Sequence, residues 1–458
     1  MVKMQAKLVP LYFDTPDDHD FVLQLSKLQQ LLSGIAEILE PVPLGQALPD
    51  ADAVLLPQIL GDAYRRVKEV RALPLPILVL TSEYGTMSMF DLDILGYLRR
   101  EGVSVIAPYT LAGTTATCRA LAAKRELREG RFLVYRDSPG EGPFQPELFK
   151  KNYWYQDECA ERLSNKFGVN TDVRSFKDLG ARAKEISDVQ ARAEWERLQE
   201  AVPVSGLSGG AVLAAMKLYM AVSDDLDEAG DVLAAGINCL NESNFADTTP
   251  CLAWNLLFME RGLMWGCESD LLSMITEFIV HRSLRVPVVM SNLYPFLIGQ
   301  AALKHERIPD FPAVDHPENY VLMAHCGYLG VVPQSFATEW TLRPKVLAIV
   351  DDNASAIDAR LPVGDLTLSK IDPTFDRLVV VEGELAGYAG WPGSDCCNGA
   401  VIRVPDGHAL LEGAPACHAV ISTGHDLPGF KLLCEVFGLD LELLDGRHAG
   451  QPLAQTIA

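Results

Sequence analysis

Apolar and polar residues follow two different patterns along this chain, and one gives way to the other near residue 295. Before that point, short apolar runs typical of buried strands alternate with longer segments of helical spacing. The runs that we predict as strands are Lys7–Phe13, Ala53–Pro57, Pro76–Leu80, Val103–Ala107, Arg131–Tyr135, Asp231–Ile237 and Val286–Met290. Such a βαβ succession predicts parallel sheets with helices between their strands.

The segments of helical spacing between these runs are predicted as helices. They cover residues 18–40, 159–167, 176–198 and 208–221. The charged segment 176–198 is predicted as one continuous helix. The strand ending at Ile237 is expected to deliver polar residues, Asn238 first, to a sheet edge where ligands commonly bind.

Beyond residue 295 the helical spacing largely disappears, and short alternating stretches are separated by Gly, Pro and Asp. This pattern predicts a small antiparallel barrel or sandwich. Its expected strands are Tyr320–Met323, Val346–Val350, Leu366–Ser369, Arg377–Val381, Ala400–Val404 and His418–Ser422. A helix is expected over 426–437.

A chain of 458 residues is too long for a single hydrophobic core. We therefore expect three domains, in an α/β fold with two Rossmann-like parallel-sheet domains followed by a C-terminal antiparallel β-barrel or sandwich. The first domain is predicted at 1–128 and the second at 129–294, which carries Glu268 and Asn292. The β domain with its terminal helix is predicted at 295–458.

The charge balance limits the partners. The formal net charge is −22, from 39 basic and 61 acidic residues, and such a surface repels nucleic acid and anionic lipid. No apolar run approaches 18 residues, and the first residues lack the apolar core of a signal peptide. The ten cysteines have no regular spacing, which fits a reducing compartment. We expect a cytoplasmic protein with neither nucleic acid nor membrane as a partner.

Four residues carry the candidate chemistry. Glu268 and Asn292 each follow a predicted β element, and the isolated histidines His325 and His418 come later. Taken singly, a glutamate is commonly a solvated surface residue, a histidine a hydrogen-bonded core residue, and an asparagine a turn former. Taken together, carboxylate, amide and imidazole groups can bind one divalent cation such as Mn²⁺, Mg²⁺ or Co²⁺.

At these residues the chain resembles the L-fucose/L-arabinose isomerase superfamily, especially its shorter branch of fucose-isomerase-like proteins. The segments that carry the resemblance run in the family's order, from about residue 130 to the end. They are Thr249–Ala253, Gly266–Asp270, Pro287–Asn292, Ala324–Gly327, Gly364–Leu368 and Cys417–Gly424.

The resemblance implies a Mn²⁺ site and interconversion of an aldose and a ketose through a cis-enediol. It implies Glu268 and His418 as metal ligands, and His325 as a further ligand or a substrate contact. Asn292 matches a position where the family has an aspartate that binds metal and helps to move the proton. The Asn292 amide oxygen can still bind metal, but it cannot accept a proton near neutral pH.

The sequence thus predicts a metal-dependent sugar isomerase with Glu268 as base and ligand. Asp270 and Glu242 are possible substitutes for that base. The resemblance also implies a homo-oligomer, a trimer or hexamer, in which Glu83 and Tyr84 contact substrate bound to a neighbouring subunit. Two alternatives stay open: a sugar-binding protein on this scaffold that has lost catalysis, and an epimerase using the same metal.

Overall fold

The computed structural model describes residues 4–57, 63–79, 89–137, 152–239, 245–295, 314–345, 352–389 and 399–445. The chain forms two compact units. The first consists of Met1–Arg128, Arg282–Arg285 and Asp426–Asp440, and the second of Glu129–His281, Val286–His425 and Leu441–Ala458. Within the described part of the chain, no helix combines the length and apolarity needed to cross a lipid bilayer.

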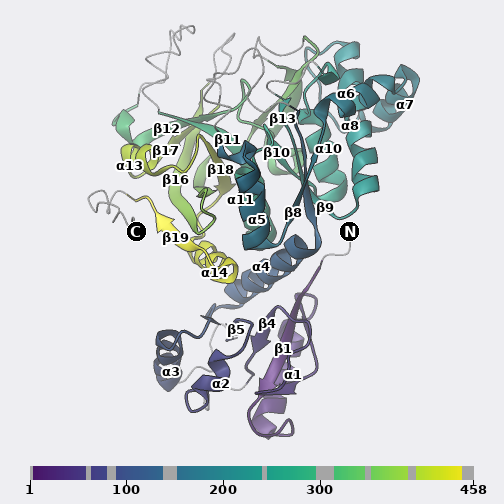
Figure 1. Ribbon diagram of the computed structural model, residues 1–458. Helices are drawn as coiled ribbons and strands as arrows, with labels where there is room; N and C mark the ends of the chain where they lie inside the picture. The colour runs from purple at the N-terminus through teal and green to yellow at the C-terminus, as the bar shows by residue number, and fades with distance from the viewer. Residues whose placement is uncertain are drawn as a thin grey trace. The chain divides into compact units, whose positions relative to one another are not determined.

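The first unit is built on a parallel sheet of six short strands (Figure 1). Its strands are β1 (Ala6–Tyr12), β2 (Ala36–Ile38), β3 (Val42–Pro43), β4 (Ala53–Leu55), β5 (Ile77–Leu78) and β6 (Val105–Ile106). They lie in the order β2-β1-β4-β5-β6, and β3 also pairs with β1. The helices are α1 (His19–Leu31), α2 (Val67–Arg71), α3 (Met89–Arg100), α4 (Leu111–Glu129, of which Glu129 belongs to the second unit) and α14 (Leu427–Phe437).

Helix α1 is shorter than predicted. It begins as expected, with the Asp18 carboxylate accepting a hydrogen bond from the Phe21 amide at 2.8 Å. It ends at Leu31. Gly34 adopts a left-handed conformation with φ of 76°, and the chain then joins the sheet as β2. The predicted helix over 18–40 was therefore wrong beyond Leu31.

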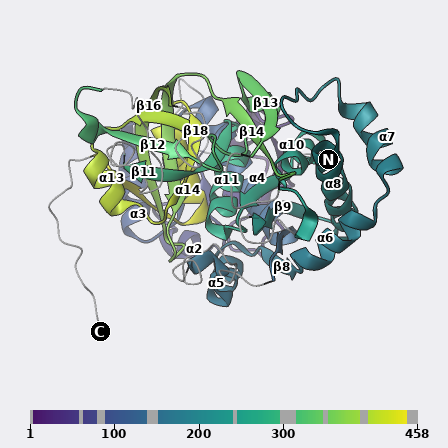
Figure 2. The same ribbon diagram turned by 90° about the horizontal axis from the view of Figure 1, so that it is seen from above.

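The second unit contains a four-stranded parallel sheet in the order β10-β9-β7-β8. Its strands are β7 (Arg131–Tyr135), β8 (Asn170–Arg174), β9 (Val232–Ile237) and β10 (Met264–Cys267). The helices of this region are η2 (Tyr153–Tyr155), α5 (Asp157–Phe167), α6 (Phe176–Glu185), α7 (Asp188–Leu198), α8 (Gly209–Ala229), α10 (Cys251–Arg261) and α11 (Leu271–Leu284). Helix α8 packs against α6, α7 and α10, and Figure 2 shows this group from above.

The single helix predicted over 176–198 is two helices, α6 and α7. Ile186 leaves the helical conformation with ψ of 124°, which ends α6. Ser187 then starts α7 with a capping box, in which its hydroxyl and the Gln190 side chain satisfy each other's backbone amides. The prediction was wrong because it counted apolar spacing across a strong helix-start signal.

The second unit also contains a closed antiparallel barrel of six strands. Its strands are β11 (Val288–Pro295), β12 (Tyr320–Ala324), β15 (Gly364–Ile371), β16 (Arg377–Ala389), β17 (Gly399–Arg403) and β18 (His418–Thr423). Five of them lie in the region beyond residue 295, where the pattern predicted a barrel or sandwich. The sixth is β11, which overlaps the run Val286–Met290; that run was predicted with the parallel sheets, but β11 pairs antiparallel with β12 and β18. Strand β19 (Asp440–Leu443) adds to β16, and β13 (Glu339–Pro344) pairs with β14 (Ser355–Arg360). Short helices η3 (Pro317–Asn319), η4 (Gln334–Phe336) and α13 (Gly407–Gly413) complete it. The predicted strand Val346–Val350 lies outside the described residues.

Helix α11 connects the parallel sheet to the barrel. Residues 271–280 are all buried. Phe278 packs against Phe132 of β7, with ring centroids 6.3 Å apart. On the barrel side, the Ile371 amide of β15 donates to the Thr276 hydroxyl at 3.1 Å. Because residues 271–280 are packed on all sides, the first residue of α11 has a fixed position. The turn that precedes α11, which contains Glu268, is therefore fixed as well.

Candidate metal centre

Glu268 lies in a tight turn between β10 and α11. Glu268 and Ser269 both adopt left-handed backbone conformations, with φ of 55° and 56°. Backbone hydrogen bonds from Ser269 to Gly266 (3.2 Å) and from Asp270 to Cys267 (3.1 Å) close the turn. Two successive non-glycine residues in this region carry strain of roughly 1–3 kcal/mol each, which surrounding structure must overcome. The turn places the Glu268 carboxylate at the carboxyl end of the parallel sheet.

Both histidines come from the barrel. His418 is the first residue of β18 and pairs with Asn292 of β11. Asn292 also pairs with Ala324, the last residue of β12. His325 follows directly, in a turn closed by hydrogen bonds in both directions between His325 and Tyr328 (2.7 and 3.1 Å). The end of β12 and the start of β18 both pair with β11 at Asn292, and this pairing brings the two imidazoles to one place.

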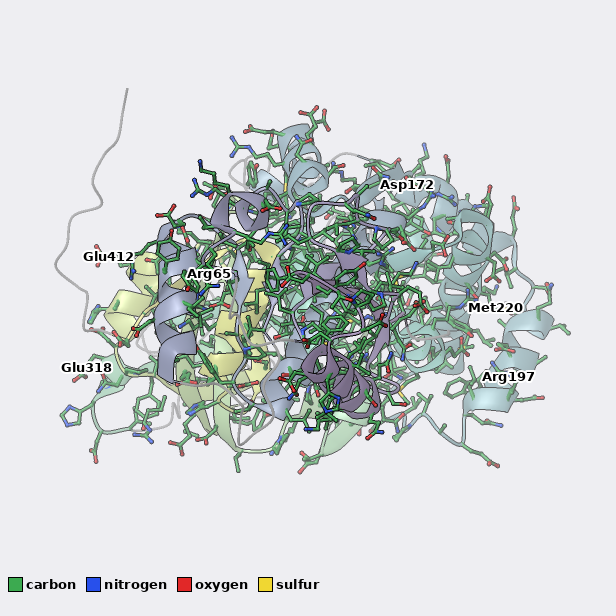
Figure 3. All side chains as sticks on the ribbon, turned by 90° about the horizontal axis from the view of Figure 1, so that it is seen from below. Arg65, Asp172, Arg197, Met220, Glu318 and Glu412 are labelled. Carbon is green, nitrogen blue, oxygen red and sulfur yellow. The ribbon has the colours of Figure 1, made fainter. Side chains whose placement is uncertain are left out.

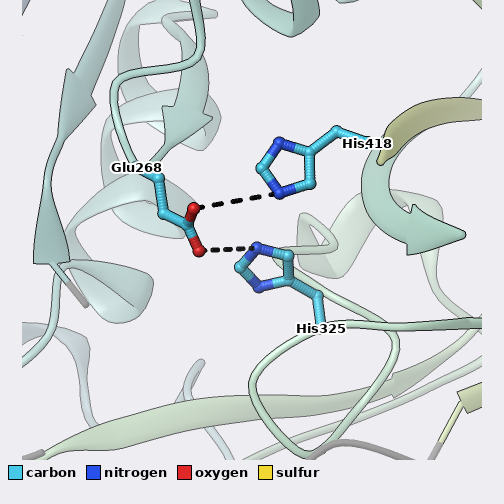
Figure 4. A group of neighbouring side chains, drawn as sticks. All are labelled: Glu268, His325 and His418. Atoms are coloured by element: carbon cyan, nitrogen blue, oxygen red, sulfur yellow. Dashed lines mark ion pairs between the residues drawn. The ribbon is translucent and has the colours of Figure 1, made fainter. Parts of the chain in front are cut away.

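Glu268, His325 and His418 form the candidate metal centre (Figure 4). Their ligand atoms all lie within 4.8 Å of one another. One Glu268 oxygen is 3.8 Å from His325 Nε2, and the other is 4.0 Å from His418 Nε2. These separations are too long for hydrogen bonds. Two ligands held at about 2.1 Å from one cation stand about 3 to 4.2 Å apart, so the spacing suits an ion between them.

An unpaired atom supports the same fit. His325 Nε2 is buried and, within the described part of the chain, has no hydrogen-bond partner. Leaving a buried nitrogen unpaired is unfavourable by about 1–3 kcal/mol. Metal coordination would satisfy that atom.

Asp270 fixes the orientation of His418. Its carboxylate is fully buried and lies 2.9 Å from His418 Nδ1. The Lys370 ammonium donates to the same oxygen at 2.9 Å, and the Ser273 hydroxyl donates at 2.7 Å. The other oxygen accepts from the Leu272 and Ser273 amides at the start of α11. With its Nδ1 proton donated to a carboxylate, His418 presents Nε2 as the free ligand atom.

The charge at Asp270 is stable despite its burial. Burial raises the pKa of this carboxyl, but the Lys370 ammonium and the hydrogen bond from His418 outweigh burial and hold the pKa far below its ordinary value. Asp270 is therefore a carboxylate throughout the physiological range. It was predicted as a possible substitute base, yet its lone pairs are occupied by His418, Lys370 and the helix start.

His325 has a sulfur neighbour instead. Its Nδ1 lies 2.9 Å from Cys326 Sγ. Burial lowers the pKa of His325, but the Cys326 sulfur and the Glu268 carboxylate outweigh burial, and the net pKa is raised. Burial raises the pKa of Cys326, but His325 and Lys345 lower it to about 7.

Asn292 lies beside the cluster. Directly paired residues on antiparallel strands place their side chains on the same face, so Asn292 shares a face with His418. Its side chain is half-buried. The position is compatible with an amide ligand, and it adds no negative charge to the site.

An aromatic and polar wall adjoins the cluster. The Trp154 ring lies against His418, with centroids 5.3 Å apart and planes inclined by 31°. The Tyr155 hydroxyl donates to Asn238 Oδ1 at 3.2 Å. The Arg136 guanidinium stacks over the Tyr155 ring at 5.8 Å and donates to the Trp154 carbonyl at 3.0 Å. Sequence reasoning did not find Trp154, Tyr155 or Arg136, although the aromatic triplet at 153–155 was a signal.

The structure brings some of the predicted site residues together, and others lie outside the residues that it describes. Glu268, His325 and His418 are brought together, and Asn292 is their neighbour by strand pairing. Lys370, which holds Asp270, was not predicted at all. Glu83, Tyr84 and Glu242 lie outside the described residues. The cluster can hold a metal ion.

Comparison of the sequence with protein-family models gives no match, and comparison with curated proteins gives none either. The chemistry of the site is therefore argued from the cluster and its neighbours.

Proposed function

We propose that this protein is a metal-dependent isomerase that interconverts an aldose and a ketose. The observation that carries the proposal is the cluster of Glu268, His325 and His418, whose ligand atoms lie within 4.8 Å of one another. A carboxylate with two imidazoles is a donor set for Mn²⁺, and Mg²⁺ and Co²⁺ are the alternatives. The sequence resemblance to sugar isomerases supports the choice of reaction.

The cation would supply Lewis acidity to two adjacent substrate oxygens, which makes the neighbouring carbon–hydrogen bond more acidic. The Glu268 carboxylate removes a proton from the carbon next to the carbonyl and returns it to the adjacent carbon. General base catalysis of this kind contributes a factor of roughly 10² to 10⁴. Asp270 holds His418 in place and takes no proton.

The finer architecture belongs to the same proposal. In it, the two parallel sheets are Rossmann-like domains, at 1–128 and 129–294, and 295–458 is the C-terminal β domain. The protein is a trimer or hexamer, with Glu83 and Tyr84 reaching substrate on a neighbouring subunit. The substrate is a small sugar.

The test is solvent-deuterium exchange. The protein is purified metal-free, supplied with Mn²⁺, Mg²⁺ or Co²⁺, and incubated in D₂O with aldoses, deoxy sugars and acidic sugars. NMR is expected to show deuterium at C1 or C2 and the appearance of the ketose. Glu268→Gln should abolish exchange, whereas Glu412→Gln, at an exposed position, should retain it. No exchange with any sugar and any of the three cations would reject the proposal.

A second candidate function is favoured by Asn292. An amide in place of a carboxylate fits a sugar-binding protein that no longer turns its ligand over. This candidate predicts ligand-induced thermal stabilisation without exchange, and isomerisation that appears in Asn292→Asp. Exchange by the unaltered protein would exclude it. Epimerisation would be seen in the same NMR spectra as a second aldose.

A further inference from the structure

The polar side chain that adjoins Glu268 on the next strand is Asn238. Ile237, the last residue of β9, pairs with Cys267, the last residue of β10. Asn238 and Glu268 are the residues that follow, at the ends of adjacent parallel strands. The Asn238 amide donates to the Tyr135 carbonyl of β7 at 3.0 Å, which ties its backbone to the sheet.

One end of the Asn238 side chain is held, and the other is not. The side chain is fully buried, and its Oδ1 accepts from the Tyr155 hydroxyl. The Nδ2 group is buried and has no hydrogen-bond partner among the residues that the structure describes. Buried donors are almost always paired in folded proteins. An unpaired buried donor beside a candidate catalytic carboxylate is therefore expected to pair with a bound ligand.

Tyr155 fixes which way the amide faces. Burial, and after it the Glu268 carboxylate, raise the pKa of Tyr155 well above its ordinary value. The hydroxyl therefore keeps its proton, and in the structure it donates that proton to Asn238 Oδ1 at 3.2 Å. Nδ2 is directed elsewhere as a donor of two hydrogens.

The neighbouring Trp154 ring lies against His418, and the Trp154 side chain acts as a hydrogen-bond donor to the Tyr155 hydroxyl. The Asn238 Nδ2 group is a donor only. A ligand atom that meets it must therefore be an acceptor with a lone pair, and an ammonium group is disfavoured.

We infer that Asn238 Nδ2 binds a substrate oxygen beyond the two that chelate the metal, held in position by Tyr155. The inference rests on the proposed function and adds a residue that positions its substrate. The ligand is a polyhydroxy compound with oxygens on at least three consecutive carbons. A two-carbon diol, which lacks the third oxygen, gains nothing from Asn238.

The experiment measures two affinities in sequence on the full chain. Mn²⁺ is titrated first, and the Mn²⁺-loaded protein is then titrated calorimetrically with ribitol, xylitol and arabinitol. Asn238→Leu removes the donor at similar volume, and Asn238→Asp replaces it with an acceptor. Both are expected to bind the preferred pentitol about tenfold more weakly or worse, as the loss of one good hydrogen bond predicts. Tyr155→Phe should weaken pentitol binding by a smaller factor, because the Asn238 amide remains and loses only the hydrogen bond that orients it.

Asn255→Leu is the matched control. Asn255 is also a fully buried asparagine of this unit, but its Oδ1 accepts from the Gln334 amide at 2.8 Å, away from the cluster. This variant is expected to bind the pentitol as the parent does. Mn²⁺ affinity should change by less than about threefold in Asn238→Leu, because Asn238 is not one of the proposed metal ligands.

The outcomes separate the two proposals. If the parent binds no divalent cation, the proposed function fails and this inference fails with it. If the parent binds Mn²⁺ but none of the pentitols, the inference alone is overturned. Pentitol affinity within twofold of the parent in either Asn238 variant that still binds Mn²⁺ would also overturn it.

Discussion

The single residue on which most of the candidate site depends is Asp270. It caps α11, orients His418 and neutralises Lys370 through one buried carboxylate. None of these three contacts involves the proposed metal directly. The site therefore combines Glu268, whose backbone is strained, with His418, whose orientation is set by a residue that does not itself bind the metal.

Asp270→Asn is expected to damage both stability and metal binding. It leaves the Lys370 ammonium buried without its counter-charge, which destabilises a fold by about 3–5 kcal/mol. Loss of the carboxylate behind His418 should weaken Mn²⁺ binding about 10- to 100-fold. Urea denaturation and Mn²⁺ titration measure the two effects.

The double variant Asp270→Asn with Lys370→Met separates them. It removes the stranded charge, so most of the stability should return while Mn²⁺ affinity stays low. Asp358→Asn, which breaks the exposed Arg343–Asp358 pair (2.8 Å), is the control and should change stability by less than about 1 kcal/mol. Full Mn²⁺ affinity in the double variant would show that Asp270 serves stability alone.

A second buried carboxyl on the same helix gives a pH prediction. Glu277 is fully buried, and burial raises its pKa well above the ordinary 4.5, against the opposing effects of the Met290 amide and Lys370. The unfolded chain therefore releases this proton at a lower pH than the folded protein does. Stability falls as pH rises from 4.5 towards the folded-state pKa.

Glu277→Gln should abolish that fall. The variant is expected to gain stability over the parent progressively above pH 5, by about 1.4 kcal/mol for each unit of pKa elevation. Denaturation midpoints measured from pH 5 to 8 test this, with the exposed Glu412→Gln as a control that should follow the parent. A constant difference between variant and parent across this range would contradict the prediction.

At the scale of elements, the close contact of β9 with the β10–α11 turn decides where Glu268 lies. A Cβ on Gly236 would stand 2.8 Å from the Gly266 carbonyl oxygen and 3.0 Å from Ser269 Cα. Both neighbours are backbone atoms of the turn itself. The turn can pack on β9 only because residue 236 has no side chain.

Gly236→Ala is therefore expected to displace the Glu268 turn. Overpacking of this kind destabilises by about 1–3 kcal/mol, and a shifted carboxylate should lower Mn²⁺ affinity as well. Gly387→Ala is the matched control, because Gly387 also lies in a strand and has open space where a Cβ would stand. Unchanged Mn²⁺ affinity in Gly236→Ala would mean that the turn adapts without moving Glu268.

The helices and strands show how much of the fold could be predicted from the sequence. Strand β7 was predicted to the residue, and the start of β18 at His418 was predicted too, because apolar runs bounded by turn residues have few other solutions. The antiparallel pattern beyond residue 295 predicted a barrel or sandwich. Closure of that barrel depends on the pairing of β12 with β17 and of β11 with β18, strands that lie far apart in the sequence. No local pattern contains such information.

The candidate site divides in the same way. Glu268, His325 and His418 were considered because their residue types suit a metal, and their roles as ligands were predicted from the family resemblance of the segments that contain them. Lys370 was not, because a lysine in a strand is ordinarily a solvated residue, and only the folded chain places it against Asp270. Trp154 and Tyr155 follow a segment with no regular pattern. The domain limits and the subunit count stay predictions.

At the scale of the whole molecule, the net charge is −22, and the acidic surface competes with the candidate metal centre for cations. Exposed charged side chains are spread over the surface, and Figure 3 labels Glu318, Glu412 and Arg197 among them. Such a surface collects divalent ions without any specific geometry, and salt screens that attraction within about 10 Å. Metal binding alone is therefore weak support for a metal centre, and the test must separate the cluster from the surface.

Thermal unfolding in 0.15 M salt provides that separation. A ligand at 100 times its Kd stabilises the folded state by about 2.7 kcal/mol, which for a chain of this size is a rise in Tm of about 3 to 6 °C. Mn²⁺ should produce this rise in the parent, and a chelator should reverse it. Glu268→Gln and His418→Gln should lose the rise, whereas Glu384→Gln, which changes net charge equally at an exposed strand position, should keep it. An equal rise in all three variants would mean that the acidic surface binds the ion, and the cluster of Glu268, His325 and His418 would then have no claim to be a metal site.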